Sequence, residues 1–149
     1  MGSQNKVANP ARLGLSSSSE DRALSRHEQV ALDTNMLLNI ARFKVNVFGD
    51  AKKMFGNVAF MVPKQVIEEL NMLSEKGLKY KKEVNIAKEA MEKNGVEIIN
   101  IAAKNADEAL KKMALEAIIA TNDKELKESV KEMNGKVLFL RQRKLLELS

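Results

Sequence analysis

The chain has 149 residues, which is enough for one domain with one hydrophobic core. Hydrophobic residues make up 44% and charged residues 30% of it, the balance of an ordinary globular protein. It contains no cysteine, so a disulfide framework, a thiolate metal site and a cysteine nucleophile are excluded. The net charge of +5 favours a polyanionic partner such as nucleic acid.

Residues 1–28 differ in composition from the rest of the chain. They include a run of four serines and show no sustained hydrophobic period, so we expect a tail or an added leader there and a single domain over 29–149. His27, the only histidine, falls in this segment, and we therefore expect no histidine catalysis. No apolar run approaches the ~18 residues that span a bilayer, and a signal-peptide core is missing, which predicts a cytoplasmic protein without a membrane partner.

The remaining sequence alternates short apolar runs with longer helical patterns. Strands are expected over 30–32, 58–62, 96–101, 117–120 and 136–140. Helices are expected over 36–43, 45–55, the segment after Pro63, 78–94, 106–115 and 124–133, with Gly56 and Gly95 as helix ends. Apolar strands separated by helices predict an α/β fold, a three-layer α/β/α sandwich around a central parallel sheet of about five strands.

Four acids fall at the carboxyl ends of the expected strands, where open parallel sheets bind their ligands. They are Asp33, Glu69, Asp107 and Asp123. Each alone fits an ordinary helix cap or a surface charge. Four carboxylates at one edge, however, repel one another unless a cation neutralises them. Oxygen ligands without His or Cys select Mg²⁺ or Mn²⁺ over zinc.

Helix phase separates neighbouring acids. In the helix after Pro63, Glu69 flanks the apolar stripe while Glu68 points nearly opposite, so Glu69 is the better placed for a cleft beside the core. The same test is weaker at the next pair, where Asp107 ranks first and Glu108 is an auxiliary candidate. Asn122 with Glu125 three residues later has the spacing of a capping box.

Four sequence blocks in this order resemble a PIN domain, and the resemblance covers Val30 to Leu148. The blocks are Val30-Ala31-Leu32-Asp33-Thr34-Asn35, Val62-Pro63 with Val66-Ile67-Glu68-Glu69-Leu70, Ala106-Asp107-Glu108-Ala109-Leu110, and Ala120-Thr121-Asn122-Asp123. Residues 41–48 and the terminal 140–144 further resemble archaeal proteins related to the eukaryotic PIN nucleases of small-subunit ribosomal RNA processing. VapC toxins share the fold and the acids but usually lack this basic terminal motif.

The resemblance implies an Mg²⁺- or Mn²⁺-dependent endoribonuclease acting on a ribosomal RNA precursor. Its metal-binding, catalytic acids would be Asp33, Glu69, Asp107 and Asp123, with Asn35 and Thr121 as supporting polar residues. Two alternatives stay open: a toxin-type ribonuclease held by an antitoxin, and a non-catalytic RNA-binding or assembly protein. PIN domains often form homodimers, but no interface can be located from the sequence.

Two basic segments are candidates for RNA binding: Lys79, Lys81 and Lys82 in one, and Arg141, Arg143 and Lys144 in the other. The terminal segment is favoured because arginine clamps phosphates and stacks on bases.

The sequence departs from the family between Asp107 and Thr121, where the family usually has a few more residues and often a glycine. Here 115–117 must pass from helix to strand without a turn residue. We therefore expect a shortened helix or a distorted crossover, which bears on how Asp107 lies relative to Asp123.

Overall fold

The computed structural model describes residues 28–149, and the expected tail with His27 lies outside this part except for Glu28, which begins the first strand. The first half of the described chain contains β1 (Glu28–Leu32), α3 (Thr34–Phe43), α4 (Val47–Phe55), β2 (Val58–Pro63), α5 (Lys64–Ser74) and α6 (Leu78–Lys93). The second half contains β3 (Glu97–Ile99), α7 (Ala106–Met113), β4 (Ile118–Ala120), α8 (Lys124–Glu132), β5 (Val137–Arg141) and β6 (Leu145–Leu148).

These strands form one six-stranded sheet in the order β3-β2-β1-β4-β5-β6. The first five strands are parallel, and β6 pairs antiparallel with β5. The predicted α/β fold with a central parallel sheet is therefore confirmed, with one further strand. Because β1 lies between β2 and β4, the carboxyl ends of these three strands are neighbours.

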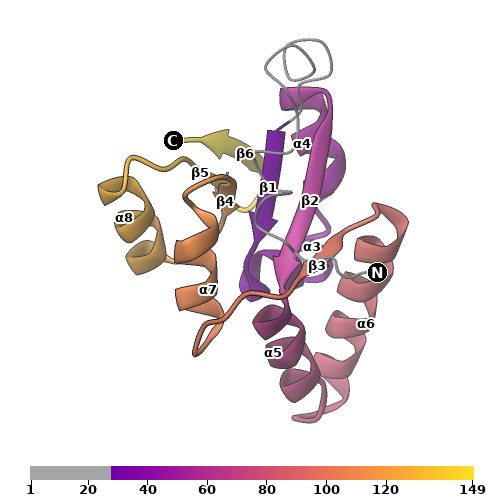
Figure 1. The fold of residues 1–149 in the computed structure, drawn as a ribbon. Helices are drawn as coiled ribbons and strands as arrows, with labels where there is room; N and C mark the ends of the chain where they lie inside the picture. The colour runs from indigo at the N-terminus through magenta and orange to yellow at the C-terminus, as the bar shows by residue number, and fades with distance from the viewer. Residues whose placement is uncertain (1–27) are drawn as a thin grey trace.

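Helices cover both faces of the sheet (Figure 1). Helices α3 and α4 connect β1 to β2, and α5 and α6 connect β2 to β3 at one side of the sheet. Helix α7 then connects β3 to β4 on the other side of β1, and α8 connects β4 to β5. Right-handed crossovers place these two sets on opposite faces. Helix α5 extends beyond the carboxyl ends of the strands and contacts α3, α6 and α7.

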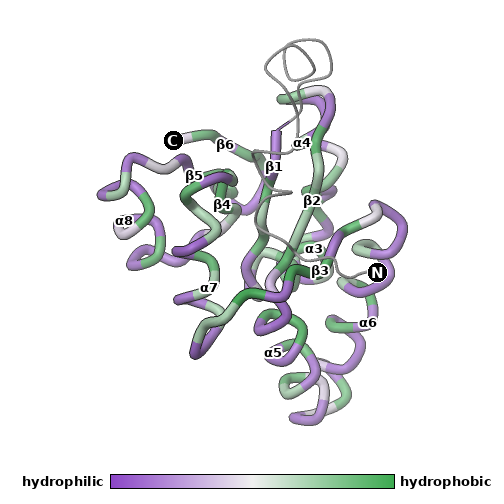
Figure 2. Tube along the Cα trace, viewed as in Figure 1, coloured by the Kyte–Doolittle hydropathy of each residue, from purple (hydrophilic) through white to green (hydrophobic). Residues whose placement is uncertain are grey.

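The core lies where these layers meet. Val30, Ala31 and Leu32 of the central strand are fully buried, and the rings of Phe48 and Phe60 meet edge to face with centroids 4.7 Å apart. The helices alternate hydrophobic and hydrophilic residues along their length, as expected of helices with one buried face (Figure 2). Across residues 28–149 no helix combines the length and the apolar character needed to cross a bilayer.

The short connection from α7 to β4 is made by ending the helix early. Helix α7 stops at Met113, two residues before its expected end, and Ala114 to Glu116 form a turn. The carbonyl of Met113 accepts hydrogen bonds from the N–H groups of Glu116 and Ala117, at 3.0 and 2.9 Å. Shortening of the helix, the first of the two expected outcomes, is what makes room for the crossover.

Strand β6 was not predicted from the sequence. The basic segment that was expected only to follow the last strand is the turn of a β5–β6 hairpin, closed by the N–H of Lys144 donating to the carbonyl of Arg141 at 3.1 Å. Gln142 and Arg143 both have positive φ, 55° and 61°. The turn lacks the Asn and Gly residues that usually adopt this conformation, so its sequence carries no hairpin signal.

We expect Gln142→Asn to raise the free energy of unfolding by about 0.5 kcal/mol, because asparagine tolerates a left-handed backbone better than glutamine. Urea unfolding monitored by circular dichroism measures the change. Gln29→Asn, the same substitution in the extended backbone of β1, should not stabilise the fold. Equal or lower stability of the Gln142 variant would contradict the strained-turn interpretation.

Candidate active site

Asp33 stands at the carboxyl end of the central strand and is 7% exposed. Its backbone N–H continues the pairing with β4 by donating to the carbonyl of Ala120 at 3.1 Å. One carboxylate oxygen, Oδ1, accepts from the N–H of Met36 at 2.7 Å and so caps α3. The other, Oδ2, accepts from the hydroxyl of Thr121. The cap thus uses only one oxygen, and capping does not exclude a role in a site.

Burial raises the pKa of Asp33 to about 6. The hydrogen bonds from Thr121 and Met36 lower this pKa, but by less than burial raises it, and the nearby carboxylates of Asp123 and Glu69 raise it further. Three of the four acids expected from the sequence therefore interact electrostatically at this edge of the sheet. Burial above all, and these neighbouring charges to a smaller degree, make the ionised form of Asp33 unfavourable, and a cation would offset both effects.

Thr121 connects Asp33 to Asp123. Its hydroxyl is fully buried, donates to Asp33 and accepts from the N–H of Asp123 at 3.0 Å. Asp123 caps α8 by accepting from the N–H of Leu126 at 2.9 Å. The expected capping box of Asn122 and Glu125 is therefore wrong, because Asp123 takes the cap position.

Asn122 instead fixes the end of β4 against β5. Its side-chain amide donates to the carbonyl of Leu140 at 2.9 Å, and its Oδ1 accepts from the N–H of Leu140 at 2.8 Å. The amide thus imitates one more residue pair of the sheet and holds the segment just before Asp123. No sequence pattern predicts this role, because an asparagine side chain that extends strand pairing has no local signature.

Glu69 reaches the site from α5. Its residue is exposed, and its Oε1 accepts from the hydroxyl of Thr34, which is 7% exposed. The neighbouring Glu68 is also exposed, but among the causes of the raised pKa of Asp33 is the charge of Glu69. Within the triplet that follows β1 it is Thr34 that contacts a site acid, whereas Asn35, expected to support the site, is exposed. The sequence of the triplet does not indicate whether Thr34 or Asn35 faces α5.

Asp107 makes its ion pair with a residue outside this group. Its side chain is 52% exposed and forms an ion pair with Lys111 one turn later, at 3.0 Å. That contact raises the pKa of Lys111. Glu108 accepts from the N–H of Lys104 at 3.2 Å and lies 3.8 Å from Lys112. Asp33 therefore lies near enough to Glu69 and Asp123 for their charges to affect it, whereas Asp107 and Glu108 contact neighbouring lysines.

The oxygen-only donor set suits a hard divalent cation. Within residues 28–149 no three Asp, Glu, His or Cys side chains form a group that could hold a metal ion as they lie. In charge and donor type the acids nevertheless fit such an ion, because Asp33 is a buried carboxylate beside two others. Asp107 contacts Lys111 instead.

The two candidate RNA-binding segments are both exposed. The hairpin turn follows the carboxyl end of β5, at the same edge of the sheet as Asp33. There the guanidinium of Arg143 lies 5.0 Å from the ring centroid of Phe43, and Arg141 pairs with Glu147 at 2.7 Å. Lys79, Lys81 and Lys82 lie at the start of α6, beyond the same edge (Figure 1).

Both the sequence and the fold of the chain are similar to those of known proteins. The chain is similar to Ribonuclease VapC4 of Methanocaldococcus jannaschii, with 31% identity over 126 residues, 80% of this chain and 95% of the relative. Its fold is similar to that of the PIN domain endonuclease Utp24, with a TM-score of 0.64 and 23% identity over 80% of this chain and 90% of that one. A domain of a functionally unknown protein from M. jannaschii has a TM-score of 0.52 and 18% identity, covering 76% and 91%.

A family model described as a PIN like domain matches residues 30–143, which run from within β1 into the hairpin turn and include all four acids. The match covers most of the chain, and the buried aspartate at the end of the central strand lies inside it. The chain belongs to the PIN-like domain family.

Proposed function

We propose that the chain is an Mg²⁺- or Mn²⁺-dependent endoribonuclease that hydrolyses RNA phosphodiester bonds, with a ribosomal RNA precursor as substrate. The observation that carries the proposal is the buried Asp33, whose pKa is raised by burial and by the charges of Asp123 and Glu69. In a family whose relatives include a ribonuclease and an endonuclease, such a group has an evident use as a cation site.

A second candidate is a toxin-type ribonuclease that an antitoxin holds inactive. The observation in its favour is the 31% identity to a protein named Ribonuclease VapC4. The basic terminal motif, now seen as the β5–β6 turn, favours the ribosomal RNA role instead. A small partner with an acidic tail encoded beside this chain would support the toxin reading.

We assign the following roles to the residues of the site. Asp33 and Asp123 would hold the principal cation, while Glu69 and Asp107 would complete a second site or orient water. Thr121 and Thr34 would hold the carboxylates of Asp33 and Glu69 in place through the hydrogen bonds that they donate. When bound, a divalent cation supplies acidification of an attacking water and neutralisation of charge on the leaving oxygen.

The basic segments would bind the RNA backbone on either side of these acids. Arg143 is the better phosphate ligand of the turn, because Arg141 already pairs with Glu147. The stack on Phe43 orients the guanidinium of Arg143 and restricts its motion, which lowers the entropy lost on binding. Lys144 and the α6 lysines would add charge along the same path.

We expect Asp33→Asn to lower the rate of cleavage of single-stranded RNA in Mn²⁺ by about a hundredfold or more, because a metal ligand is lost while the helix cap is kept. Glu69→Gln should lower it by about tenfold. Glu68→Gln, the same change one residue away, is the control and should stay within about twofold. Cleavage by the Asp33 variant at the wild-type rate would contradict the assignment, and absence of both cleavage and Mn²⁺ binding in the wild type would favour the non-catalytic alternative.

The raised pKa of Asp33 predicts how stability depends on pH in the absence of metal. The folded chain keeps a proton up to about pH 6, whereas the unfolded chain loses it near the ordinary value of 3.8. Stability should therefore fall as pH rises between these values. Asp33→Asn removes the penalty, so this variant should be about 1–3 kcal/mol more stable than the wild type at pH 7.5 and no more stable at pH 3.5. Urea unfolding in EDTA measures it, and a variant less stable at pH 7.5 would contradict the pKa.

Arg143→Ala combined with Lys144→Ala should weaken binding to single-stranded RNA and reduce the salt dependence of the binding constant by about 1.4 units in log–log slope, since two phosphate contacts are lost. Fluorescence anisotropy at several salt concentrations measures both. Lys53→Ala with Lys93→Ala removes the same charge near the starts of β2 and β3, at the opposite edge, and should change the slope little. Equal effects of the two double variants would show that only net charge matters.

A further inference from the structure

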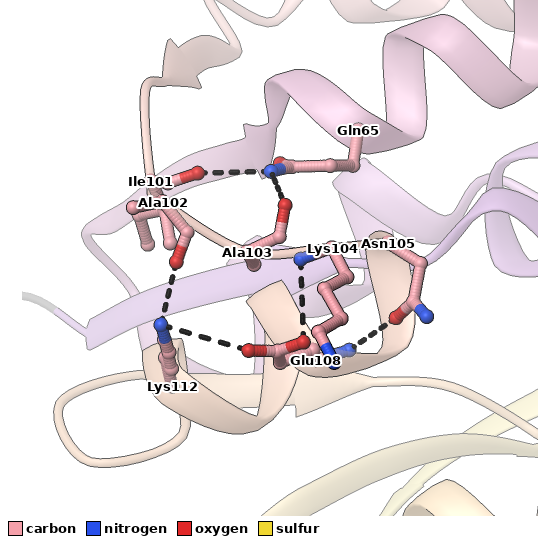
Figure 3. A network of polar contacts seen from close by, with 8 residues as sticks. All are labelled: Gln65, Ile101, Ala102, Ala103, Lys104, Asn105, Glu108 and Lys112. Atoms are coloured by element: carbon pink, nitrogen blue, oxygen red, sulfur yellow. Dashed lines mark hydrogen bonds and ion pairs between the residues drawn. The ribbon is translucent and has the colours of Figure 1, made fainter.

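The loop between β3 and α7 is held by side chains (Figure 3). Gln65 of α5 donates from Nε2 to the carbonyls of Ile101 and Ala103, at 2.9 and 3.0 Å. From the other side Lys112 of α7 donates to the carbonyl of Ala102 at 2.5 Å, and Glu108 accepts from the N–H of Lys104. These side chains hold a segment of irregular backbone in one conformation.

Gln65 differs from the other tethers because it is buried. Its residue is 5% exposed, whereas the side chain of Lys112 is 51% exposed. Water can replace an exposed hydrogen bond readily but not a buried one, so Gln65 restrains the loop most strongly. One amide nitrogen bound to two carbonyls two residues apart also fixes the local backbone geometry of the loop.

The other end of the Gln65 amide has no partner in the described residues. Its Oε1 is buried and finds no hydrogen-bond donor among the described residues. An unsatisfied buried acceptor opposes the gain from the two bonds that Nε2 makes. The two bonds fix the conformation of the loop, and that conformation determines where the following helix begins.

The loop leads directly into the helix that carries Asp107. Asn105 caps α7 by accepting from the N–H of Glu108 at 2.8 Å, and Asp107 is the second residue of the helix. Gln65 also precedes Glu69 by four residues on α5, which places both side chains on the same helix face. Gln65 therefore links the element that carries Glu69 to the loop that sets the position of Asp107.

We propose that Gln65 is a positioning residue of the cation site, which holds the α7 terminus where Asp107 can turn from Lys111 and join Glu69 and Asp33. This inference rests on the proposed function, because it requires Asp107 to be a ligand. Gln65 touches neither the cation nor the RNA in this role. It acts only through the loop and the helix that follows.

The first test is hydrogen exchange of the full chain without metal. In Gln65→Met, which keeps the length and most of the volume of the side chain, the amides of Lys104 and Glu108 should exchange at least about tenfold faster. The amide of Asp33, bound in the sheet, should be unchanged, as should all of these amides in the control variant Gln29→Met. Unchanged exchange at Lys104 and Glu108 would overturn the tether.

The second test is titration with Mn²⁺ followed by electron paramagnetic resonance, which needs no catalysis. Gln65→Met should weaken Mn²⁺ binding about tenfold in the wild-type background and have no further effect in Asp107→Asn, because its role passes through that carboxylate. An equal loss in both backgrounds would show a general structural effect and overturn the proposal, as would no loss in either.

The two proposals fail in different ways. If the wild type binds Mn²⁺ and Gln65→Met binds it equally well, the positioning role fails and the proposed function stands. If the wild type binds no Mn²⁺, both fail together. A single loss in the wild-type background, accompanied by faster exchange of the loop, is the result that supports Gln65.

Discussion

The burial of one carboxylate, that of Asp33, is the constraint on which the rest of the site depends. The central position of β1 between β2 and β4 buries the end of the strand, and Asp123 and Glu69 add negative charge beside it. The hydrogen bonds from Thr121 and Met36 compensate only part of the resulting penalty, as the raised pKa of Asp33 records. A bound cation would favour the ionised form of Asp33 instead of opposing it. Binding of the cation would therefore stabilise the folded chain.

The same acids serve the fold and the site. Asp33 and Asp123 each cap a helix through Oδ1, and this geometry fixes the direction of the remaining oxygen. Helices that follow parallel strands begin at the carboxyl edge of the sheet. The residues that cap the starts of these helices therefore lie at that same edge. The structural and the functional interpretations of these aspartates are therefore compatible, and helix capping supplies the rigidity that a metal ligand needs.

The sequence was most informative where burial and topology act alone. Apolar strands such as Val30 to Leu32 predicted the parallel sheet, and helix phase distinguished Glu69 from Glu68, because both signals depend on which side of an element faces the core. Strand β6 could not be predicted, because Gln142 and Arg143 adopt positive φ in a turn that usually contains Asn or Gly. The side-chain roles of Thr34, Asn122 and Gln65 also could not be predicted, because their partners are 18 to 38 residues away in sequence.

The chain's net charge of +5 and its acidic centre would act in opposite directions on the proposed RNA ligand. The exposed arginines and lysines would attract the phosphate backbone, whereas the three carboxylates would repel the phosphate that came nearest to them. A divalent cation removes this conflict by turning the repelling centre into an attracting one. Its effect would be local, because the basic residues lie on separate elements, the hairpin turn and α6, and keep their charge in either state. The distribution of charge is therefore what favours a metal: a basic surface would bring RNA to this edge, and a cation among the acids would let one phosphodiester remain there.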